Sequence, residues 1–306
     1  MLSNGQPQHR PQPRQDIKPT VIPESPPPPT KRQTREAPVD VDGLSSPTTR
    51  QTRASARTIS RVRSPTPKGW SESTPGWRGQ WRNSLVFPAE GKSRATVDLD
   101  DIPRLDEGQF LNDNLIIFYL RYLQYHLEKE YPGLAERVYF HNTFFYDKLK
   151  PSRAGGAINY DSVKSWTSKV DLFQKDFIIV PINEYSHWYV AIIYNAPKLL
   201  PQPGNPDVAG AAISSAAQNP ISLDYDRIIT LDSLGGAHSP ACQALTKYLV
   251  AEMMDKKDIA IEPPKSLGMT AKDVPQQHNY CDCGLFLLGY IRQLLQDPDS
   301  FVRNIL

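Results

Sequence analysis

The sequence predicts an α+β fold in which a mixed sheet faces a helical lobe. Residues 177–182 and 188–195 are near-continuous apolar runs of strand length, which is the pattern of strands covered on both faces. After residues 112 and 283, apolar side chains recur three and four positions apart and indicate amphipathic helices. Apolar runs cluster only in the later part of the chain, so we expect the folded domain at residues 83–306.

The first 82 residues have the composition of a disordered basic tail rich in Pro, Ser and Thr. Of the 29 prolines in the chain, 13 fall in the first 70 positions, where few apolar residues are available for burial. These 70 positions hold 12 Lys and Arg against 5 Asp and Glu, and the remainder holds 23 against 28. A flexible basic segment beside a mildly acidic domain predicts weak contact with nucleic acid or acidic proteins.

Several protein classes are excluded by composition. Three cysteines in 306 residues cannot form a disulfide framework, and no apolar run reaches the roughly 18 residues of a membrane-spanning helix. The first residues also lack the apolar core of a secretory signal. We therefore expect a soluble intracellular protein without membrane contact, in a reducing compartment that suits a free thiol.

The first half of the domain begins with short elements. Residues 85–88 and 95–99 predict two strands around a turn, and a helix then opens at Asn112 or Asp113, because either side chain can cap it. The expected core face of that helix has helical spacing and comprises Ile116, Tyr119, Leu120 and Leu123. Residues 137–149 combine a strand with a helical turn, and a short helical segment follows.

The second half supplies the centre of the sheet and two further helices. Residues 227–236 predict a buried strand that ends in a turn, and residues 197–222, rich in Pro, Gly, Ala and Ser, predict a flexible insertion. Ser239 starts a helix whose apolar face includes Cys242, so this cysteine is interpreted as a core residue. The last predicted helix begins near Cys283 and leaves that thiol in its first turn.

Four polar residues stand at the ends of buried elements: His187, Asp232, Gln277 and Cys283. A thiol is mostly protonated at neutral pH, so a reactive one needs a nearby base and a positive potential, which an imidazole and a helix N-terminus supply. A carboxylate can orient that imidazole, and an amide can donate to an oxyanion. Taken singly, however, a histidine at a strand end is more often structural and an aspartate before Ser-Leu-Gly is more often a turn residue.

Four separated motifs strengthen the catalytic interpretation. These are FLND (110–113), VPINEYSHWYVAIIYN (180–195), IITLDSLGG (228–236) and VPQQHNYCDCGLFLLGYI (274–291). In this order they resemble the sentrin/SUMO-specific cysteine peptidases, also known as the ubiquitin-like protease family. The motifs are most similar to the branch of this family that edits SUMO chains. The resemblance implies a papain-like cysteine protease fold for roughly residues 84–306 and does not extend to the tail.

The resemblance also implies roles for individual residues. The family's nucleophile falls on Cys283, its base on His187, its orienting acid on Asp232 and its oxyanion-hole amide on Gln277, with Gln276 as the less favoured neighbour. No cofactor is implied. The reaction would be isopeptide hydrolysis, in which the enzyme removes SUMO from conjugated proteins and trims SUMO chains.

Two aromatic residues match the substrate tunnel of the family. Trp188 corresponds to the aromatic lid that confines the modifier's Gly-Gly tail, and Phe110 occupies the place of a second aromatic that is a tryptophan in many members. Each residue also has a plain interpretation as part of the hydrophobic core. Both interpretations stay open at this point.

A metal site is the competing interpretation of the segment that contains the nucleophile. His278, Cys281 and Cys283 superficially resemble a metal cluster, but a structural zinc site requires four ligands and the chain has no second Cys/His group with paired spacing. We therefore predict no metal. Cys281 is interpreted as a bystander or a minor redox-sensitive thiol.

Several functional alternatives remain. The modifier could be a Nedd-type protein or ubiquitin, the domain could be a catalytically silent SUMO-binding adaptor, and the Cys/His pair could serve acyl transfer. The expected partners are SUMO and SUMO-conjugated proteins, and the expected state is a monomer. The family and the basic tail predict nuclear location, with the cytoplasm as the alternative. Because domains of this family continue a little further, we also expect the chain to be a fragment.

Overall fold

The computed structural model describes residues 68–91, 93–153, 156–200, 227–264 and 267–306. Most of the predicted tail and residues 201–222 of the predicted insertion lie outside the described residues. The described part of the predicted tail contains two short helices, α1 (Trp70–Ser73) and α2 (Trp77–Gln80). Trp77 is only 5% exposed and belongs to the hydrophobic core. The average composition of the predicted tail did not indicate the burial of Trp77, because a single tryptophan can bury a large apolar area within an otherwise polar segment.

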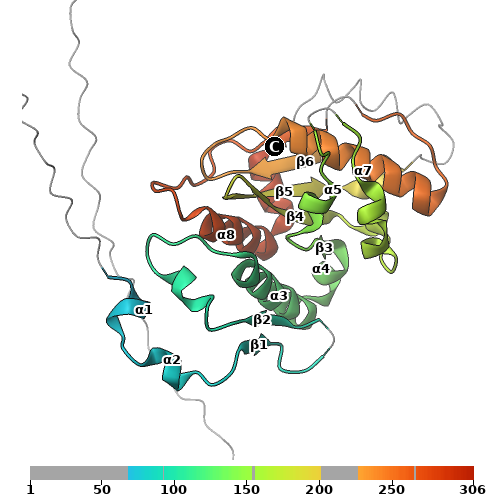
Figure 1. The fold of residues 1–306 in the computed structure, drawn as a ribbon. Helices are drawn as coiled ribbons and strands as arrows, with labels where there is room; N and C mark the ends of the chain where they lie inside the picture. The colour runs from blue at the N-terminus through green and yellow to red at the C-terminus, as the bar shows by residue number, and fades with distance from the viewer. Residues whose placement is uncertain (1–67, 92, 154–155, 201–226, 265–266) are drawn as a thin grey trace, which may run out of the picture. The chain divides into compact units, whose positions relative to one another are not determined.

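The main sheet has five strands in the order β3-β4-β5-β6-β7 (Figure 1). β4 pairs antiparallel with β5, β5 pairs antiparallel with β6, and the two outer pairs are parallel, so the sheet is mixed. β1 and β2 form a separate antiparallel pair. The strands are β1 (Leu85–Phe87), β2 (Ala95–Val97), β3 (Val138–Phe140), β4 (Phe177–Glu184), β5 (His187–Tyr194), β6 (Arg227–Leu231) and β7 (Gly268–Thr270).

Helices cover both faces of the main sheet. The longer ones are α3 (Asp113–Glu130), α7 (Ser239–Lys257) and α8 (Cys283–Gln296), and the shorter ones are α4 (Pro132–Arg137), α5 (Phe145–Leu149) and α9 (Pro298–Ile305). The described residues also contain five 3-10 segments: η1 (Ile102–Leu105), η2 (Tyr160–Ser162), η3 (Lys164–Thr167), η4 (Leu172–Gln174) and η5 (Ala196–Leu199). None of the described helices is long and apolar enough to cross a membrane.

Two hydrophobic cores lie on opposite faces of the sheet. Because successive strand side chains point to opposite faces, Ile179 and Val190 pack with α3 and α8. Ile178 and Tyr189, one position away, pack with α5 and α7. Figure 1 shows α3 and α8 side by side, with α7 across the strands from them. The predicted α+β class, with a mixed sheet facing helices and central strands covered on both faces, is confirmed.

The first turn of α8 is held tightly against the start of α3. Asn112 caps α3, because its side chain accepts a hydrogen bond from the Leu115 N–H. A Cβ atom at Gly284 would lie 2.9 Å from the Cβ of Leu111, so only glycine allows this approach. The position of Cys283 relative to the sheet therefore depends on its glycine neighbour.

Candidate active site

The ends of β5, β6 and α8 bring three of the predicted residues together. His187 is the first residue of β5, Asp232 directly follows β6, and Cys283 is the first residue of α8. The His187 Nε2 atom lies 2.7 Å from the Asp232 Oδ1 atom. The His187 imidazole also forms a hydrogen bond with the Cys283 thiol. The structure thus connects Cys283, His187 and Asp232 in a row.

A tight hairpin places His187 at the edge of the sheet. Glu184 at the end of β4 pairs with His187, which leaves only Tyr185 and Ser186 in the turn. Both turn residues have positive φ, 54° and 64°, as a two-residue type I′ hairpin requires. Neither residue is the Asn or Gly that this turn favours, so the backbone here is held in a sparsely populated conformation. Such conformations cluster at functional sites.

Asp232 accepts four hydrogen bonds and is only 3% exposed. Besides His187, its donors are the backbone N–H of Leu234 at 2.8 Å and that of Gly236 at 3.1 Å. The fourth partner is the His238 Nε2 atom, 2.8 Å from Oδ2. Burial alone would raise the pKa of this carboxyl, but the hydrogen bonds from His187, His238 and Leu234 together hold the pKa well below its usual value.

His238 is a site residue that the sequence prediction missed. Its ring stacks on Tyr189 with centroids 3.5 Å apart and planes 9° apart, which fixes its orientation toward Asp232. The only signal in the sequence is its place six residues after Asp232, beyond the Gly-Gly turn. A Cβ atom at Gly236 would lie 2.6 Å from the Asp232 Oδ2 atom, so glycine is required for the loop to fold over the carboxylate.

The environment favours an ion pair between His187 and Cys283. The hydrogen bond with Asp232, followed by that with Cys283, raises the pKa of His187 to about 9. Burial works to raise the pKa of Cys283, but the hydrogen bond with His187 and those from the backbone N–H groups of Trp188 and Gly284 outweigh it and lower that pKa. Opposite shifts of this kind populate an imidazolium beside a thiolate near neutral pH.

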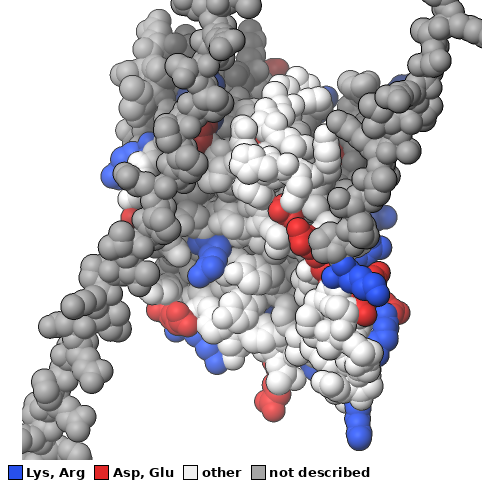
Figure 2. Space-filling model, turned by 90° about the vertical axis from the view of Figure 1, so that its left-hand side faces the viewer, with Lys and Arg blue, Asp and Glu red and all other residues white. Residues whose placement is uncertain are grey.

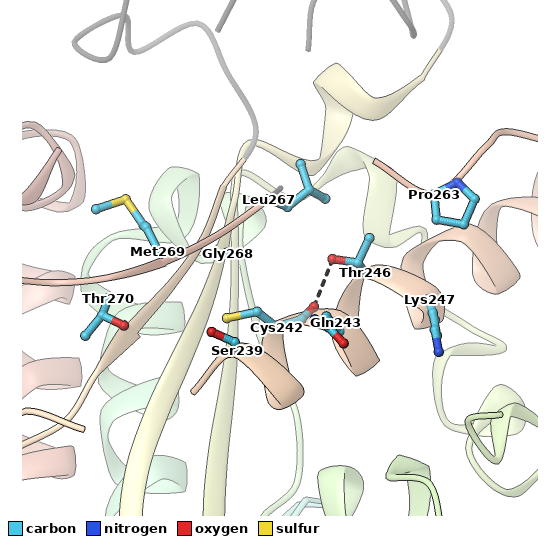
Figure 3. A pocket seen from close by; sticks show the side chains of 10 residues that line it. All are labelled: Ser239, Cys242, Gln243, Thr246, Lys247, Pro263, Leu267, Gly268, Met269 and Thr270. Atoms are coloured by element: carbon cyan, nitrogen blue, oxygen red, sulfur yellow. Dashed lines mark hydrogen bonds between the residues drawn. The ribbon is translucent and has the colours of Figure 1, made fainter. Parts of the chain in front are cut away.

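The other two cysteines have no comparable activation. Cys281 contacts the Asp282 carboxylate, and burial together with that negative charge raises its pKa. Cys242 is buried in α7 beside a cavity of about 460 Å³ between α7 and β7 (Figure 3), and burial raises its pKa to about 11. Among the described residues, no group of three or more His, Cys, Asp and Glu side chains could hold a metal ion. Cys242 is a core residue, as its helical spacing predicts.

Gln277 lies in the loop before α8 and is fixed by three hydrogen bonds. Its backbone N–H donates to the Ser233 carbonyl at 3.0 Å, and its Oε1 accepts from the Ser233 hydroxyl at 2.6 Å. Its Nε2 atom donates to the Asn279 carbonyl at 2.7 Å. An amide nitrogen carries two hydrogens, so one N–H of Gln277 is left for a further acceptor. The preceding Gln276 lies next to Gly235 instead.

The two predicted tunnel residues lie on elements that touch each other. Trp188 is only 2% exposed, and its indole N–H donates to the Leu111 carbonyl at 2.9 Å. Phe110, the neighbour of Leu111, is 40% exposed. Trp188 is therefore buried against the chain segment that carries Phe110, and Phe110 itself faces solvent.

The site divides its residues between a helix, which carries the thiol, and strand ends, which carry the imidazole and the carboxylate. Papain-like cysteine proteases divide their active sites in the same way, and this class fits both the fold and the site. Residues 109–304 match the model of the Ulp1 protease family, C-terminal catalytic domain. The chain belongs to this family.

Individual relatives agree with this assignment. Ubiquitin-like-specific protease 2 of Schizosaccharomyces pombe is 36% identical over 232 residues, which cover 72% of this chain and 36% of the relative. Sentrin-specific protease 7 of Mus musculus is 30% identical over 261 residues, which cover 70% of this chain and 25% of the relative. The chain thus spans well under two thirds of the curated relatives that it matches.

A solved structure supports the fold independently. The chain superposes on a crystal structure described as a de-sumoylating protease with a TM-score of 0.57 and 26% identity, covering 72% of this chain and 76% of that one. The family predicted from the four motifs is therefore confirmed. The relatives above belong to the chain-editing branch that the motifs indicated.

Proposed function

We propose that this domain is a cysteine isopeptidase that removes SUMO from conjugated proteins and trims SUMO chains. The observation that carries the proposal is the row of Cys283, His187 and Asp232, in which the thiol shares a hydrogen bond with an imidazole that is bound to a buried carboxylate. The family and the branch of its relatives support SUMO as the modifier. The unit that acts is proposed to include α1 and α2, since Trp77 belongs to the core.

The proposed reaction has two steps. In the first, the Cys283 thiolate attacks the carbonyl carbon of the modifier's C-terminal glycine, and the His187 imidazolium gives its proton to the departing lysine amine. In the second, water attacks the thioester while His187 accepts one of its protons. The modifier leaves as a carboxylic acid, which loses the other proton to solvent, and the thiolate–imidazolium pair is restored. The backbone N–H of Cys283 and the remaining N–H of Gln277 are proposed to donate to the oxyanion in both steps.

Exposed apolar side chains near the site support recognition of a protein substrate. Tyr185, Leu234 and Tyr280 are 101%, 53% and 89% exposed, and each lies within three residues of His187, Asp232 or Cys283. Exposed tyrosines such as Tyr185 and Tyr280 are common anchors in protein interfaces. We propose that they contact the folded body of the modifier, while Trp188 and Phe110 confine its extended tail.

Location and further partners follow from the same proposal. We propose that the protein is nuclear and that the basic tail makes a weak nucleic-acid contact, because the first 70 residues hold 12 Lys and Arg against 5 Asp and Glu, whereas the remainder is net negative. On the face of the described domain shown in Figure 2, basic and acidic side chains are interspersed around wide uncharged areas. That face has no single-sign field, so it gives no support for a second nucleic-acid surface there.

The modifier is tested by a substrate panel. Purified full chain is expected to convert SUMO chains to monomers at least about 100-fold faster than it cleaves ubiquitin or Nedd-type conjugates. The reason is that the enzyme is proposed to contact both the folded body and the extended tail of the modifier. Band intensities on gels give the rates. If another modifier were cleaved faster, that modifier and not SUMO would be the substrate. SUMO binding without turnover would identify an adaptor. Dependence on acetyl-coenzyme A would identify an acyltransferase.

The pH dependence of kcat/KM tests the proposed ion pair. The pKa of His187 is raised to about 9, so the imidazole is still protonated at neutral pH. It loses this proton as the pH rises through about 9. The lowered pKa of Cys283 keeps its thiolate populated to a lower pH than an ordinary thiol would allow. We expect a plateau around neutral pH and an alkaline decline near 9. A decline centred near 6.5 would instead mean that Asp232 does not stabilise the imidazolium.

A further inference from the structure

The segment between η1 and α3 carries Phe110, one of the two proposed tunnel residues. Residues 107–110 are all exposed, so packing in the core does not fix them. A turn closes the first part of the segment, because the Gln109 N–H donates to the Asp106 carbonyl at 3.1 Å. Gly108, with a φ of 81°, has the left-handed backbone that a type II turn requires at its third position. The position of Phe110 therefore depends on the contacts that hold the two ends of this segment.

The C-terminal end of the segment is held by the tunnel and by α3. The Leu111 carbonyl accepts a hydrogen bond from the Trp188 indole at 2.9 Å, and the Asn112 side chain caps α3. The Asn112 Nδ2 atom also donates to the Asp101 Oδ1 atom at 2.6 Å, and Asp101 is only 6% exposed. These contacts fix the chain that directly follows Phe110.

The N-terminal end of the segment is held by α1. The Ser71 backbone N–H donates to the Asp106 Oδ1 atom at 3.1 Å, and the Ser71 hydroxyl donates to the Asp106 Oδ2 atom. Gly69, directly before α1, lies so close that a Cβ atom there would be 2.5 Å from the Asp106 Oδ2 atom. The carboxylate at the start of the turn is thus held by residues more than thirty positions earlier in the chain.

A buried tryptophan anchors α1 to the domain. Trp77 is only 5% exposed and belongs to the same hydrophobic core as Leu111. Its indole N–H donates to the Ser71 carbonyl at 2.9 Å. The core therefore holds Trp77, Trp77 holds the backbone of Ser71, and Ser71 holds the Asp106 carboxylate.

We propose that Ser71 is a positioning residue for the substrate tunnel. It fixes the turn that starts at Asp106, and this turn presents Phe110 to the extended tail of the modifier. The inference rests on the proposed function, because that tail is the ligand that Phe110 is proposed to confine. If the turn is loose, substrate binding has to order it, and this ordering costs affinity. Loss of the contact is therefore expected to weaken substrate binding more than the chemical steps at Cys283.

Ser71→Ala removes the hydroxyl donor and keeps the backbone donor, so the variant is expected to fold. Its KM for SUMO conjugates is expected to rise at least about fivefold, because a hydrogen bond to a charged group is lost. Its kcat is expected to stay within about twofold of the wild type, since the reacting groups are unchanged. A fall in kcat with an unchanged KM would overturn the positioning role.

Two glycines near Ser71 provide a second variant and a matched control. Gly69→Ala places a methyl group against the Asp106 carboxylate and displaces it from Ser71, so the same rise in KM is expected. Gly79→Ala, in α2, adds the same methyl group where no described atom lies within 4 Å, so its KM is expected to equal that of the wild type. Equal effects of the two variants would contradict the proposal, because they would show a general sensitivity of this segment.

A double variant shows whether Ser71 acts through Phe110. Phe110→Ala alone is expected to raise KM. Addition of Ser71→Ala to Phe110→Ala is expected to change KM by less than about twofold, because the side chain that Ser71 positions is then absent. If Ser71→Ala kept its full effect in this background, Ser71 would act by another route and the proposal would be wrong.

Hydrogen exchange tests the inference without substrate. The Gln109 amide is bonded within the turn, so it is expected to exchange at least about fivefold faster in Ser71→Ala than in the wild type or Gly79→Ala. Faster exchange in a protein that cleaves no conjugate would support the hold of Ser71 on the turn and contradict only the proposed function. Unchanged exchange of the Gln109 amide would overturn the inference, whatever the cleavage rates.

Discussion

Replacement of Cys283 by alanine is expected to lower the cleavage of SUMO chains by at least about 10⁴-fold, which brings it to the limit of detection. The reason is chemical, because the two remaining thiols, Cys242 and Cys281, have raised pKa values and therefore supply little thiolate to form the thioester. The side chain is only 1% exposed and alanine is smaller, so the variant is expected to fold. Gel assays give the rate, and circular dichroism together with retained SUMO binding shows that the fold is intact.

Cys281→Ala is the matched control, two residues away on the same segment. Its thiol has a raised pKa and contacts Asp282, so its removal is expected to change the rate by less than about threefold. Brief alkylation at neutral pH is expected to modify Cys283 first, because the lowered pKa makes it the most populated thiolate. Loss of activity in Cys281→Ala with retention in Cys283→Ala would assign the nucleophile to Cys281 and overturn the proposed mechanism.

The sequence predicted the part of the fold and site that depends on local patterns. The apolar runs that form β4 and β5 can be buried only if both faces of these strands are covered, and strands of this kind lie at the centre of a sheet. His187, Asp232 and Cys283 each stand at the end of such a run or at the start of an amphipathic helix. Residues at the ends of buried elements can meet above a rigid core, so local patterns indicated that these three could converge. Their catalytic roles came from the resemblance of the four motifs and stay a proposal.

The features that were missed depend on tertiary contacts. β7 has only three residues, and it packs closely against α7. This approach requires a glycine at position 268, since a Cβ there would lie 2.5 Å from the Cβ of Cys242, and no periodicity in the sequence reveals that requirement. His238 becomes a partner of Asp232 only after the Gly-Gly loop folds back over the carboxylate. Trp77 lies in a segment whose average composition indicates disorder, yet its ring fills a place in the core.

Asp232→Asn is expected to lower kcat by about 10³- to 10⁴-fold while leaving the fold intact. An asparagine side chain has one acceptor oxygen, whereas Asp232 accepts from His187, His238, Leu234 and Gly236. If the amide oxygen keeps the contacts of Oδ1, its NH₂ group faces His238 and the Gly236 N–H. If it is turned round, its NH₂ group faces His187 and holds the ring in the wrong tautomer. In both orientations the negative charge that stabilises the imidazolium is lost.

The pH profile distinguishes this electrostatic role from a structural one. Since the hydrogen bond with Asp232 is the largest cause of the raised pKa of His187, the alkaline limb of kcat/KM in Asp232→Asn is expected to move down from about 9 toward the usual histidine range. His238→Gln removes the imidazole contact with Oδ2 and the stacking on Tyr189 but keeps the charge of Asp232, so it is expected to reduce the rate by no more than about tenfold and to leave that limb near its wild-type position. An equal loss in both variants with an unmoved limb would mean that Asp232 only holds the loop. A loss confined to Asp232→Asn, together with the downward shift, would identify its charge as the stabiliser of the His187 imidazolium.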